Sequence, residues 1–187
     1  EYERTSTAVL NSYVQPVAAR YVDSLDRELD KLKVSDRRYI MQSNGGTVSF
    51  AQSKISPINM VESGPVAGVF GAAVVGKLIG EKNIIALDIG GTTAKCSLIE
   101  NAEMKVTTDY KIEWTRETAG YPIKVPVVDI IEIGAGGGSI AWVDAANSLH
   151  VGPQSAGALP GPVCYGRGGN EPTVTDANLI AGRINPE

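Results

Sequence analysis

The sequence is poor in the residues that build metal and disulfide sites. Its 187 residues include one histidine, His150, and two cysteines, Cys96 and Cys164, which lie far apart in the chain. A widely spaced cysteine pair argues against a disulfide scaffold and favours a reducing compartment, so we expect a cytoplasmic protein. Too few histidine and cysteine ligands are present for a zinc site of the usual kind.

The sequence also lacks a strong surplus of either charge. Its formal net charge is −4, which predicts neither a nucleic-acid surface nor attachment to an anionic membrane. The one long apolar run, residues 63–80, is too short and too rich in glycine for a membrane span, and it contains Lys77. No secretory leader opens the chain. A helical pattern begins almost at residue 1, and residues 185–187 follow directly after another helical pattern. We therefore expect an internal piece of a longer protein.

Glycine, in contrast, is abundant and clustered. The chain has 21 glycines, a share above the average for globular proteins. The clusters lie at 45–46, 64–80, 90–91, 134–138 and 152–169. Clustered glycine indicates tight turns, close backbone approach, or backbone amides left bare for a ligand.

Apolar periodicity predicts four helices. Residues 5–33 repeat apolar side chains at a period near 3.6, with Thr5 or Ser6 as the cap and a kink or break at Pro16. The other helices are expected at 47–55, 63–80 and 175–183. The helix at 63–80 is apolar on nearly every side and should be buried, with Ser63 as its cap and Gly80 as its stop.

The remaining segments predict short strands and loops. Strands are expected at 38–43, 83–87, 94–99, 111–114, 123–127, 130–133 and 139–143, and a Gly/Pro-rich loop at 150–172. The strand at 83–87 is continuous and apolar, which is typical of a buried strand. Together these elements predict an α/β fold.

The sharpest chemical signal follows the strand at 83–87. Asp88 ends that strand, Gly90 and Gly91 turn the chain, and Thr92 and Thr93 add two hydroxyls. Bare backbone amides form an anion-binding concavity, and a nearby carboxylate can hold Mg²⁺ directly or through water. A nucleotide's terminal phosphates need this set of groups, although a plain hairpin turn has the same glycine pattern.

Two other phosphate loops are excluded. The P-loop pattern G-x-x-x-x-G-K-[ST] is absent. Gly134–Gly138 partly matches a dinucleotide-binding loop, but the residues after it, 139–143, predict a strand where that motif needs a helix. The loop at 134–138 either lines a cleft with bare backbone or marks a point where strands pack closely.

Many ordered motifs resemble the hydantoinase A/oxoprolinase family. They occupy residues 3–7, 41–46, 63–65, 88–92, 133–141, 151–153, 155–158, 160–162, 164–169 and 171–179, which is nearly the whole chain. The resemblance implies a ribonuclease-H-like fold of the actin, sugar-kinase and heat-shock-ATPase type, present here in part. Residues 1–80 would then end the first lobe and include the helix between the lobes, whose glycines at 64–71 allow a pivot. Residues 81–187 would begin the second lobe.

The family resemblance also implies an activity. Its members use ATP and Mg²⁺ to phosphorylate a carbonyl-type oxygen of a cyclic amide or an enolised ketone, commonly with a hydantoinase B-type subunit or domain as partner. Carried over by motif, Asp88 would be the catalytic Mg²⁺ ligand, and Gly90, Gly91, Thr92 and Thr93 would hold phosphate. This chain departs from the family in having Ala94-Lys95 where Ser/Thr-Asp is common. Lys95 would then pair with phosphate or point to solvent.

Several other residues are candidates for the same cleft. A role in substrate or cleft contact is considered for Gly136, Gly137, Gly138, Ser139, Cys164 and Arg167. Cys164 near a cation has the surroundings that lower a thiol pKa, but no histidine partners it in sequence, so a structural or contact role is favoured over a nucleophile. Asp129 and Glu132 are weaker candidates for a base or metal ligand. His150 is interpreted as structural and Asp176 as a helix cap.

Three functional classes follow from these signals. The first is an ATP-dependent cyclic-amide hydrolase, with a 5-oxoproline, hydantoin or lactam substrate. The second is a subunit of an ATP-dependent ketone carboxylase. The third is a non-enzymatic actin-like or chaperone-like ATPase; a simple scaffold whose hairpin binds nothing is the plainest alternative. The motif at 160–169 favours the enzymes over the chaperone-like class.

Overall fold

The computed structural model describes residues 1–113 and 117–186. It is a mixed α/β structure in which the chain forms two compact units. The first unit contains Glu1–Ile84 and Leu98–Asp129, and the second contains Ile85–Ser97 and Ile130–Glu187. The predicted lobes at 1–80 and 81–187 concern the longer protein and stay a prediction. Among the described residues, no helix is both long and apolar enough to cross a membrane.

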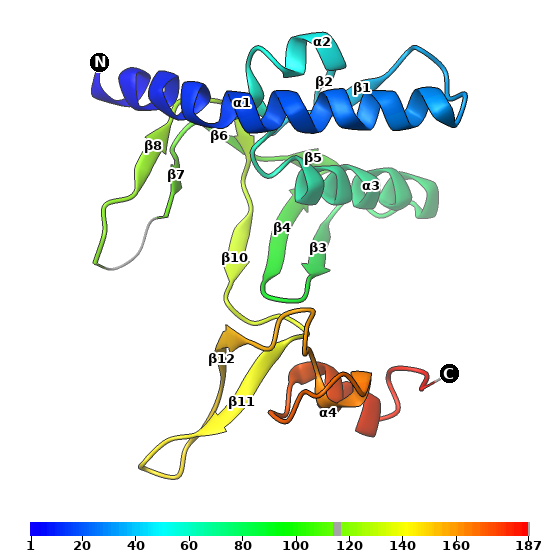
Figure 1. The fold of residues 1–187 in the computed structure, drawn as a ribbon, viewed down its shortest axis with the longest axis vertical. Coiled ribbons are helices and arrows are strands. Elements are labelled where there is room, and N and C mark those ends of the chain that lie inside the picture. Colours follow the sequence, from blue (N-terminus) through cyan, green and yellow to red (C-terminus); the bar gives the residue numbers. More distant parts are fainter. Residues whose placement is uncertain (114–116, 187) are drawn as a thin grey trace. The chain divides into compact units, whose positions relative to one another are not determined.

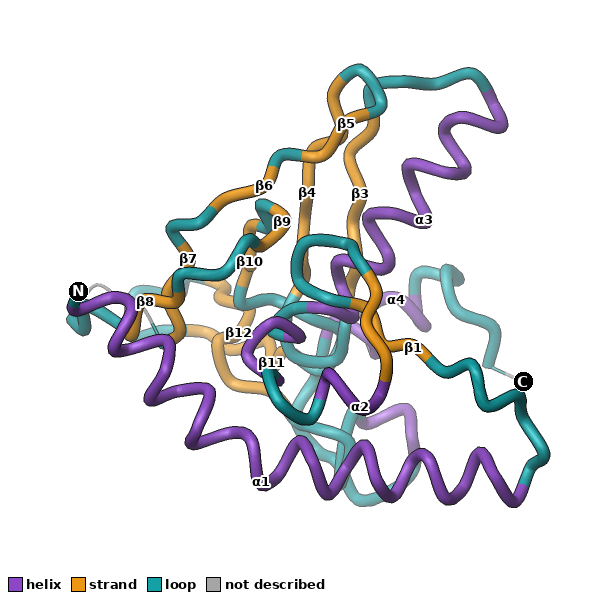
Figure 2. The backbone as a smooth tube through the Cα atoms, turned by 90° about the horizontal axis from the view of Figure 1, so that it is seen from above, coloured by secondary structure: helices purple, strands orange, loops and turns teal. Residues whose placement is uncertain are grey.

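The first unit is organised along one long helix, α1 (Tyr2–Lys31). A short hairpin, β1 (Tyr39–Met41) and β2 (Thr47–Ser49), leads into α2 (Phe50–Ser53), the 3-10 turn η1 (Pro57–Met60) and α3 (Ser63–Ile79). Figures 1 and 2 both show α2 alongside α1, and η1 also contacts α1.

Later strands complete this unit. β6 (Val106–Thr107) pairs with β9 (Val127–Val128), and β7 (Tyr110–Ile112) pairs with β8 (Tyr121–Ile123). A small core forms where Ile58 of η1 meets Ile123, Val125 and Val127, all under a tenth exposed. Trp114, part of the strand expected at 111–114, lies outside the described residues.

Of the kink or break expected at Pro16, the break is wrong, because α1 continues through Pro16 as one helix. Contacts on both sides of Pro16 explain this. Asn11 and Gln15 donate side-chain hydrogen bonds to the carbonyls of Ile55 and Lys54, at 3.2 Å each, and the Lys54 ammonium lies 2.7 Å from Asp23. Both halves of the helix are therefore fastened to the same segment, which offsets the backbone bond that proline removes. The expected caps are also wrong, since Glu1 is the N-cap and makes no side-chain capping bond.

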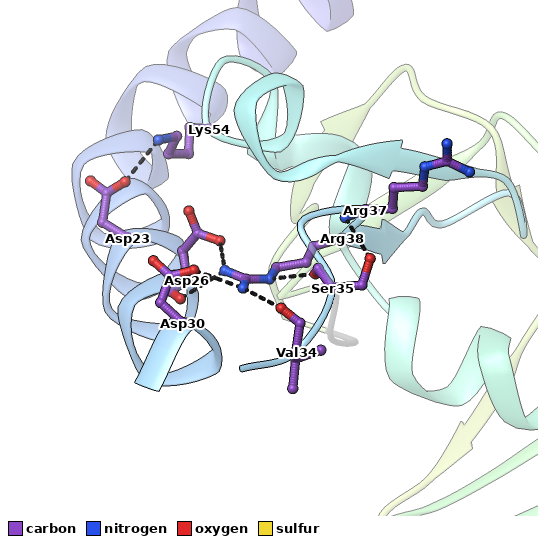
Figure 3. A network of polar contacts seen from close by, with 8 residues as sticks. All are labelled: Asp23, Asp26, Asp30, Val34, Ser35, Arg37, Arg38 and Lys54. Carbon is purple, nitrogen blue, oxygen red and sulfur yellow. Dashed lines mark hydrogen bonds and ion pairs between the residues drawn. The ribbon is translucent and has the colours of Figure 1, made fainter. Parts of the chain in front are cut away.

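The C-terminal end of α1 is held by Arg38 (Figure 3). Its guanidinium lies 2.6 Å from Asp26 and 2.7 Å from Asp30, and it donates to the carbonyls of Val34 and Ser35. The Arg38 side chain is only 7% exposed. Hydrogen bonds to both aspartates raise the pKa of Arg38 above its ordinary value. This network connects the end of α1 to the start of β1.

The second unit is built on short antiparallel strands (Figure 1). The chain enters on β3 (Ile84–Ile89) and returns on β4 (Ala94–Glu100), whose far end pairs with β5 (Glu103–Met104) in the first unit. β4 lies between β3 and β10 (Ile131–Ile133) in this sheet. Glu132 of β10 lies opposite Lys95 of β4. A hairpin of β11 (Ser139–Val143) and β12 (Leu149–Ser155) follows, then the 3-10 turn η2 (Val163–Tyr165) and α4 (Val174–Ile180).

Five sequence predictions are corrected here. The helix expected at 47–55 is a strand, β2, followed by the single turn α2, because Ser49 caps a new helix start. The loop expected at 150–172 begins with a strand, β12, which pairs with β11. The strand expected to be buried at 83–87 is largely exposed, and one side of α3 is also exposed, with Leu78 at 81%. Glu62, not Ser63, is the N-cap of α3, whereas Gly80 ends it in the left-handed conformation as predicted.

Candidate functional site

The turn between β3 and β4 has the geometry of a small anion cradle. The N–H of Gly90 donates to the carbonyl of Thr93 at 2.9 Å, which closes the turn. Within the described chain, the N–H groups of Gly91 and Thr92 donate to no protein acceptor. Both residues are exposed, as is Asp88 just before the turn. Two free amides and a carboxylate are therefore exposed at this end of the hairpin.

The glycine loop at 134–138 packs directly against this turn. Gly137 and Gly138 donate their N–H groups to the carbonyls of Gly90 and Gly91, at 2.8 and 2.6 Å. A Cβ at Gly136 would lie 2.6 Å from the Gly90 carbonyl oxygen, closer than real Cβ atoms approach. Only glycine allows this backbone contact, and the contact gives the Gly90 and Gly91 carbonyls hydrogen-bond donors from the glycine loop.

Hydrogen bonds with Ser139 and Thr175 hold the glycine loop in place. The buried Ser139 hydroxyl accepts the N–H of Gly136 at 2.8 Å, and Thr175 donates both its N–H and its hydroxyl to the carbonyl of Gly137. Of the sequence candidates, Ser139 therefore supports the loop from within the structure and does not line the cleft. Thr175, the first residue of the helix expected at 175–183, connects α4 to the loop.

The turn and the glycine loop line a cleft of about 470 Å³ within the second unit. Its lining residues are Ile89, Gly90, Gly91, Thr92, Gly137, Gly138, Gly157, Ala158, Pro162, Tyr165 and Thr175. None of them carries a carboxylate, while free backbone N–H groups and the hydroxyls of Thr92 and Tyr165 supply donors. Donors without competing negative charge suit an anionic ligand. The sequence left open whether this loop lines a cleft or marks a close backbone contact. Gly137 and Gly138 do both, because they line the cleft and pack against the turn between β3 and β4.

Several candidates lie outside the cleft lining. The ammonium of Lys95 is 3.9 Å from Glu132 across β4 and β10, and the Lys105 ammonium lies 3.1 Å from Asp129. Both acidic candidates thus take part in ion pairs. Thr93 is half-buried beneath the turn, where its carbonyl closes the bend. Neither Thr93 nor Lys95 is among the residues that line the cleft.

Cys164 does not have the surroundings of an activated thiol. Its pKa is raised above the ordinary value, chiefly by a hydrogen bond to Asp176, with burial and the charge of that carboxylate acting in the same direction. The cation expected to lower its pKa, Arg167, lies instead over the ring of Tyr165, 5.6 Å from the ring centroid. A protonated thiol is a poor nucleophile, so the geometry agrees with a structural or contact role.

Asp176 organises this end of the unit. It is 8% exposed and accepts hydrogen bonds from the N–H groups of Cys164 and Thr173, at 2.7 and 2.8 Å, and from the Thr173 hydroxyl. Burial alone would raise the pKa of this carboxyl, but these hydrogen bonds outweigh burial and hold the pKa far below its usual range. The N-cap of α4 is Thr173 and not Asp176, but Asp176 completes a capping box with Thr173 from the first turn of the helix.

His150 also has a structural position. Its ring stacks on Trp142 with centroids 4.6 Å apart, and its Nε2 lies 2.6 Å from Asp144. Hydrogen bonds from the Ser148 N–H and from His150 lower the pKa of Asp144. All three residues belong to the β11–β12 hairpin or its connecting loop, and none lines the cleft.

The residues near the turn fit Mg²⁺ only in a limited way. Among the described residues, no cluster of three or more histidine, cysteine or carboxylate side chains has the spacing of a metal site. Asp88 is a single exposed carboxylate beside an anion cradle. This donor set is compatible with a magnesium ion that takes most of its ligands from water and phosphate, as Mg²⁺ in nucleotide sites does.

Comparison with known proteins agrees with these features. The chain is 41% identical to the caprolactamase subunit alpha of Pseudomonas jessenii, covering 98% of this chain and 26% of that one. It is 36% identical to 5-oxoprolinase 1 of Arabidopsis thaliana, over 98% of this chain and 14% of the relative. The nucleotide-free structure of an acetone carboxylase, titled for ATP-dependent acetone carboxylation, superposes with a TM-score of 0.81 at 30% identity, over 100% of this chain and 25% of that one.

The chain therefore spans about a quarter, or less, of the length of these relatives. The family model described as hydantoinase/oxoprolinase matches residues 4–187, which include the turn, the glycine loop and the cleft. This chain belongs to the hydantoinase/oxoprolinase family.

Proposed function

We propose that this chain is the phosphate-binding part of an ATP-dependent enzyme that phosphorylates the carbonyl oxygen of a cyclic amide before ring opening. The observation that carries the proposal is the pair of free N–H groups at Gly91 and Thr92, two residues that line a cleft without carboxylates. Family membership favours an enzyme over a non-enzymatic actin-like ATPase.

The chemistry explains why such an enzyme needs ATP. Resonance makes an amide carbonyl a poor electrophile, and a phosphoryl group on its oxygen supplies a good leaving group. In this chain, the Gly91 and Thr92 amides would hold phosphate oxygens, and the rigid glycine loop would keep those amides aimed at the ligand. Fixed donors of this kind stabilise developing negative charge without reorganisation. Asp88 is the residue that would hold Mg²⁺, which neutralises phosphate charge when bound.

The proposal extends to the whole protein. We infer an actin-like, ribonuclease-H-like arrangement in which this hairpin is one of several elements around the nucleotide, with the remaining elements supplied by further polypeptide. A relative named as a subunit, caprolactamase subunit alpha, supports a partner subunit of the hydantoinase B type. The similarity to an acetone carboxylase supports ketone carboxylation as the second candidate function.

The test is ATP hydrolysis by the full-length protein with its partner, screened over 5-oxoproline, hydantoins, lactams and ketones. We expect one cyclic amide to stimulate hydrolysis, and a ketone that does so instead would select the second candidate. A Gly91→Val variant should lower kcat/KM for ATP about a hundredfold, because its side chain shields the free amides.

Gly134→Val is the matched control. Both glycines have no heavy atom within 4 Å of a new Cβ, so neither substitution creates a clash, but only Gly91 lines the cleft. Equal activity of the two variants, or no stimulation by any compound, would overturn the proposal.

A further inference from the structure

The cleft is rich in donors but has no cation among its lining residues. A bound phosphate carries close to two negative charges, and phosphoryl-binding sites usually neutralise part of them with arginine, lysine or a metal ion. The lining of this cleft offers backbone N–H groups and hydroxyls only. A positive side chain next to the cleft wall would therefore complete the site.

The second unit offers few candidates for that charge. Its lysine and arginine residues are Lys95, Arg167 and Arg183. Lys95 lies close to Glu132, and Arg183 donates to the side chain of Asn178 at 3.2 Å. In the described chain, Arg167 has no ion pair or hydrogen bond from its side chain, and its one recorded contact is with the ring of Tyr165.

The loop that carries Arg167 also contributes Tyr165 to the lining of the cleft. Tyr165 ends η2 and lines the cleft together with Gly91 and Thr92. Gly166 and Gly168 flank Arg167 in the left-handed conformation, at φ of 65° and 92°. These two bends return the chain so that the guanidinium lies over the ring of Tyr165.

Further contacts make the loop rigid. The N–H of Cys164 is held by the Asp176 carboxylate at 2.7 Å, and that of Tyr165 donates to the Pro162 carbonyl at 3.1 Å. A Cβ at Gly169 would collide with the Gly161 carbonyl, which shows how closely the two ends of the loop approach each other. In the described chain, a guanidinium without a carboxylate partner thus lies over the ring of Tyr165, which itself lines the cleft.

We propose that Arg167 is the cation that contacts the phosphoryl group bound in this cleft, and that Tyr165 is the positioning residue that holds it there. This inference rests on the proposed function and adds the residue that neutralises the ligand. The cation–π contact restricts the long arginine side chain without using up its hydrogen-bond donors, which stay free for two phosphate oxygens.

Binding of inorganic pyrophosphate to the full-length protein tests the inference, measured by isothermal titration calorimetry at low and high salt. Arg167→Gln should weaken binding about ten- to a hundredfold and reduce its salt dependence, because hydrogen bonds to a charged group are lost. Arg167→Lys should recover part of the affinity. Arg183→Gln is the matched control, since it removes a guanidinium of the same unit outside the cleft, and its affinity should equal that of the unchanged protein.

The role of Tyr165 is tested by a double-mutant cycle. Tyr165→Leu should weaken binding, Tyr165→Phe should lose less affinity than Tyr165→Leu because a ring remains, and Tyr165→Leu combined with Arg167→Gln should bind no more weakly than Arg167→Gln alone. Independent, additive losses would overturn the positioning role. Circular dichroism of each variant verifies folding.

The outcomes also separate this inference from the proposed function. If Gly91→Val loses pyrophosphate binding while Arg167→Gln stays within about twofold of the unchanged protein, Arg167 is not the cation and the proposed function stands. If the unchanged protein binds neither pyrophosphate nor ATP, the proposed function itself fails.

Discussion

At the scale of single residues, Asp176 does the most to fix the candidate site. One buried carboxylate accepts hydrogen bonds from the backbone of η2 and from the cap of α4, and both elements contribute residues to the cleft. An amide in its place would have one acceptor oxygen, and its NH₂ group would face backbone N–H donors. A neutral side chain of the same shape therefore cannot replace a carboxylate that accepts several hydrogen bonds.

We predict that Asp176→Asn loosens this region by about 1–3 kcal/mol, because N–H groups lose their charged acceptor. Amide hydrogen exchange of peptides covering residues 160–176 in the full-length protein measures the effect, with faster exchange expected at Cys164 and Thr173. Asp144→Asn is the control, since Asp144 lies in the exposed loop between β11 and β12. Unchanged exchange in Asp176→Asn would contradict the assignment.

The same carboxylate gives a pH dependence with a defined sign. The pKa of Asp176 is lower in the folded state than the value of about 3.9 expected when unfolded. The unfolded state therefore binds the proton more tightly, and the stabilisation is complete above about pH 4 and decreases as the pH falls further. The difference in exchange between the unchanged protein and Asp176→Asn should stay constant from pH 7 to about pH 4 and shrink below it. A difference that shrinks between pH 7 and 5 would point to another group.

At the scale of elements, α1 depends on contacts that its own sequence does not reveal. Pro16 predicts a break, yet Asn11 and Asp23 bind the same distant segment and keep the helix continuous. In the same way, the Gly/Pro-rich residues 149–155 form a strand because β11 offers them a partner. Local propensity identifies α3 and the hairpin around Asp88, but it cannot include hydrogen bonds from residues far away in the chain.

In the candidate site, too, local features can be predicted from the sequence, whereas contacts between distant residues cannot. The amide turn at Gly90 and Gly91 is readable from the sequence because the whole feature is local. Tyr165 and Thr175 were not predicted as cleft residues, because only folding brings them to a turn more than seventy residues earlier. The one signal that pointed to Tyr165 was its place in the motif at 160–169, next to Arg167.

The hydrogen bonds of Arg38 lead to a prediction for the stability of the C-terminal end of α1. Its guanidinium makes several directed bonds that a lysine cannot reproduce, so Arg38→Lys should speed hydrogen exchange at the C-terminal end of α1 several-fold. Lys31→Gln is the matched control, because it removes an ion pair to Glu28 at the same helix end, with both side chains mostly exposed. Equal effects of the two variants would mean that Arg38 acts only as a surface charge.

At the scale of the whole molecule, α3 raises the question of what covers it. A helix that is apolar on all sides is stable in water only when surrounded by protein. Here Val66, Val69 and Ala73 are buried, while Leu78 and Ile79 are 81% and 69% exposed. The side that carries Gly68 and Gly71 has no heavy atom within 4 Å of a new Cβ. The chain spans about a quarter of the length of the caprolactamase and acetone carboxylase relatives, and we propose that further polypeptide covers this side of α3.

This reasoning predicts that Gly68→Ala destabilises the full-length protein by about 1–3 kcal/mol, because the added methyl group overpacks a close backbone contact. If that side of α3 faces water in the full-length protein, the same substitution should instead stabilise it by about 1 kcal/mol through helix propensity. The two cases differ in sign, so hydrogen exchange of α3 peptides distinguishes them. Lys77→Ala, on the same helix, adds no bulk at Gly68 and serves as the control. A stabilised Gly68→Ala protein would remove the basis for placing a neighbour, or a pivot between lobes, at this side of α3.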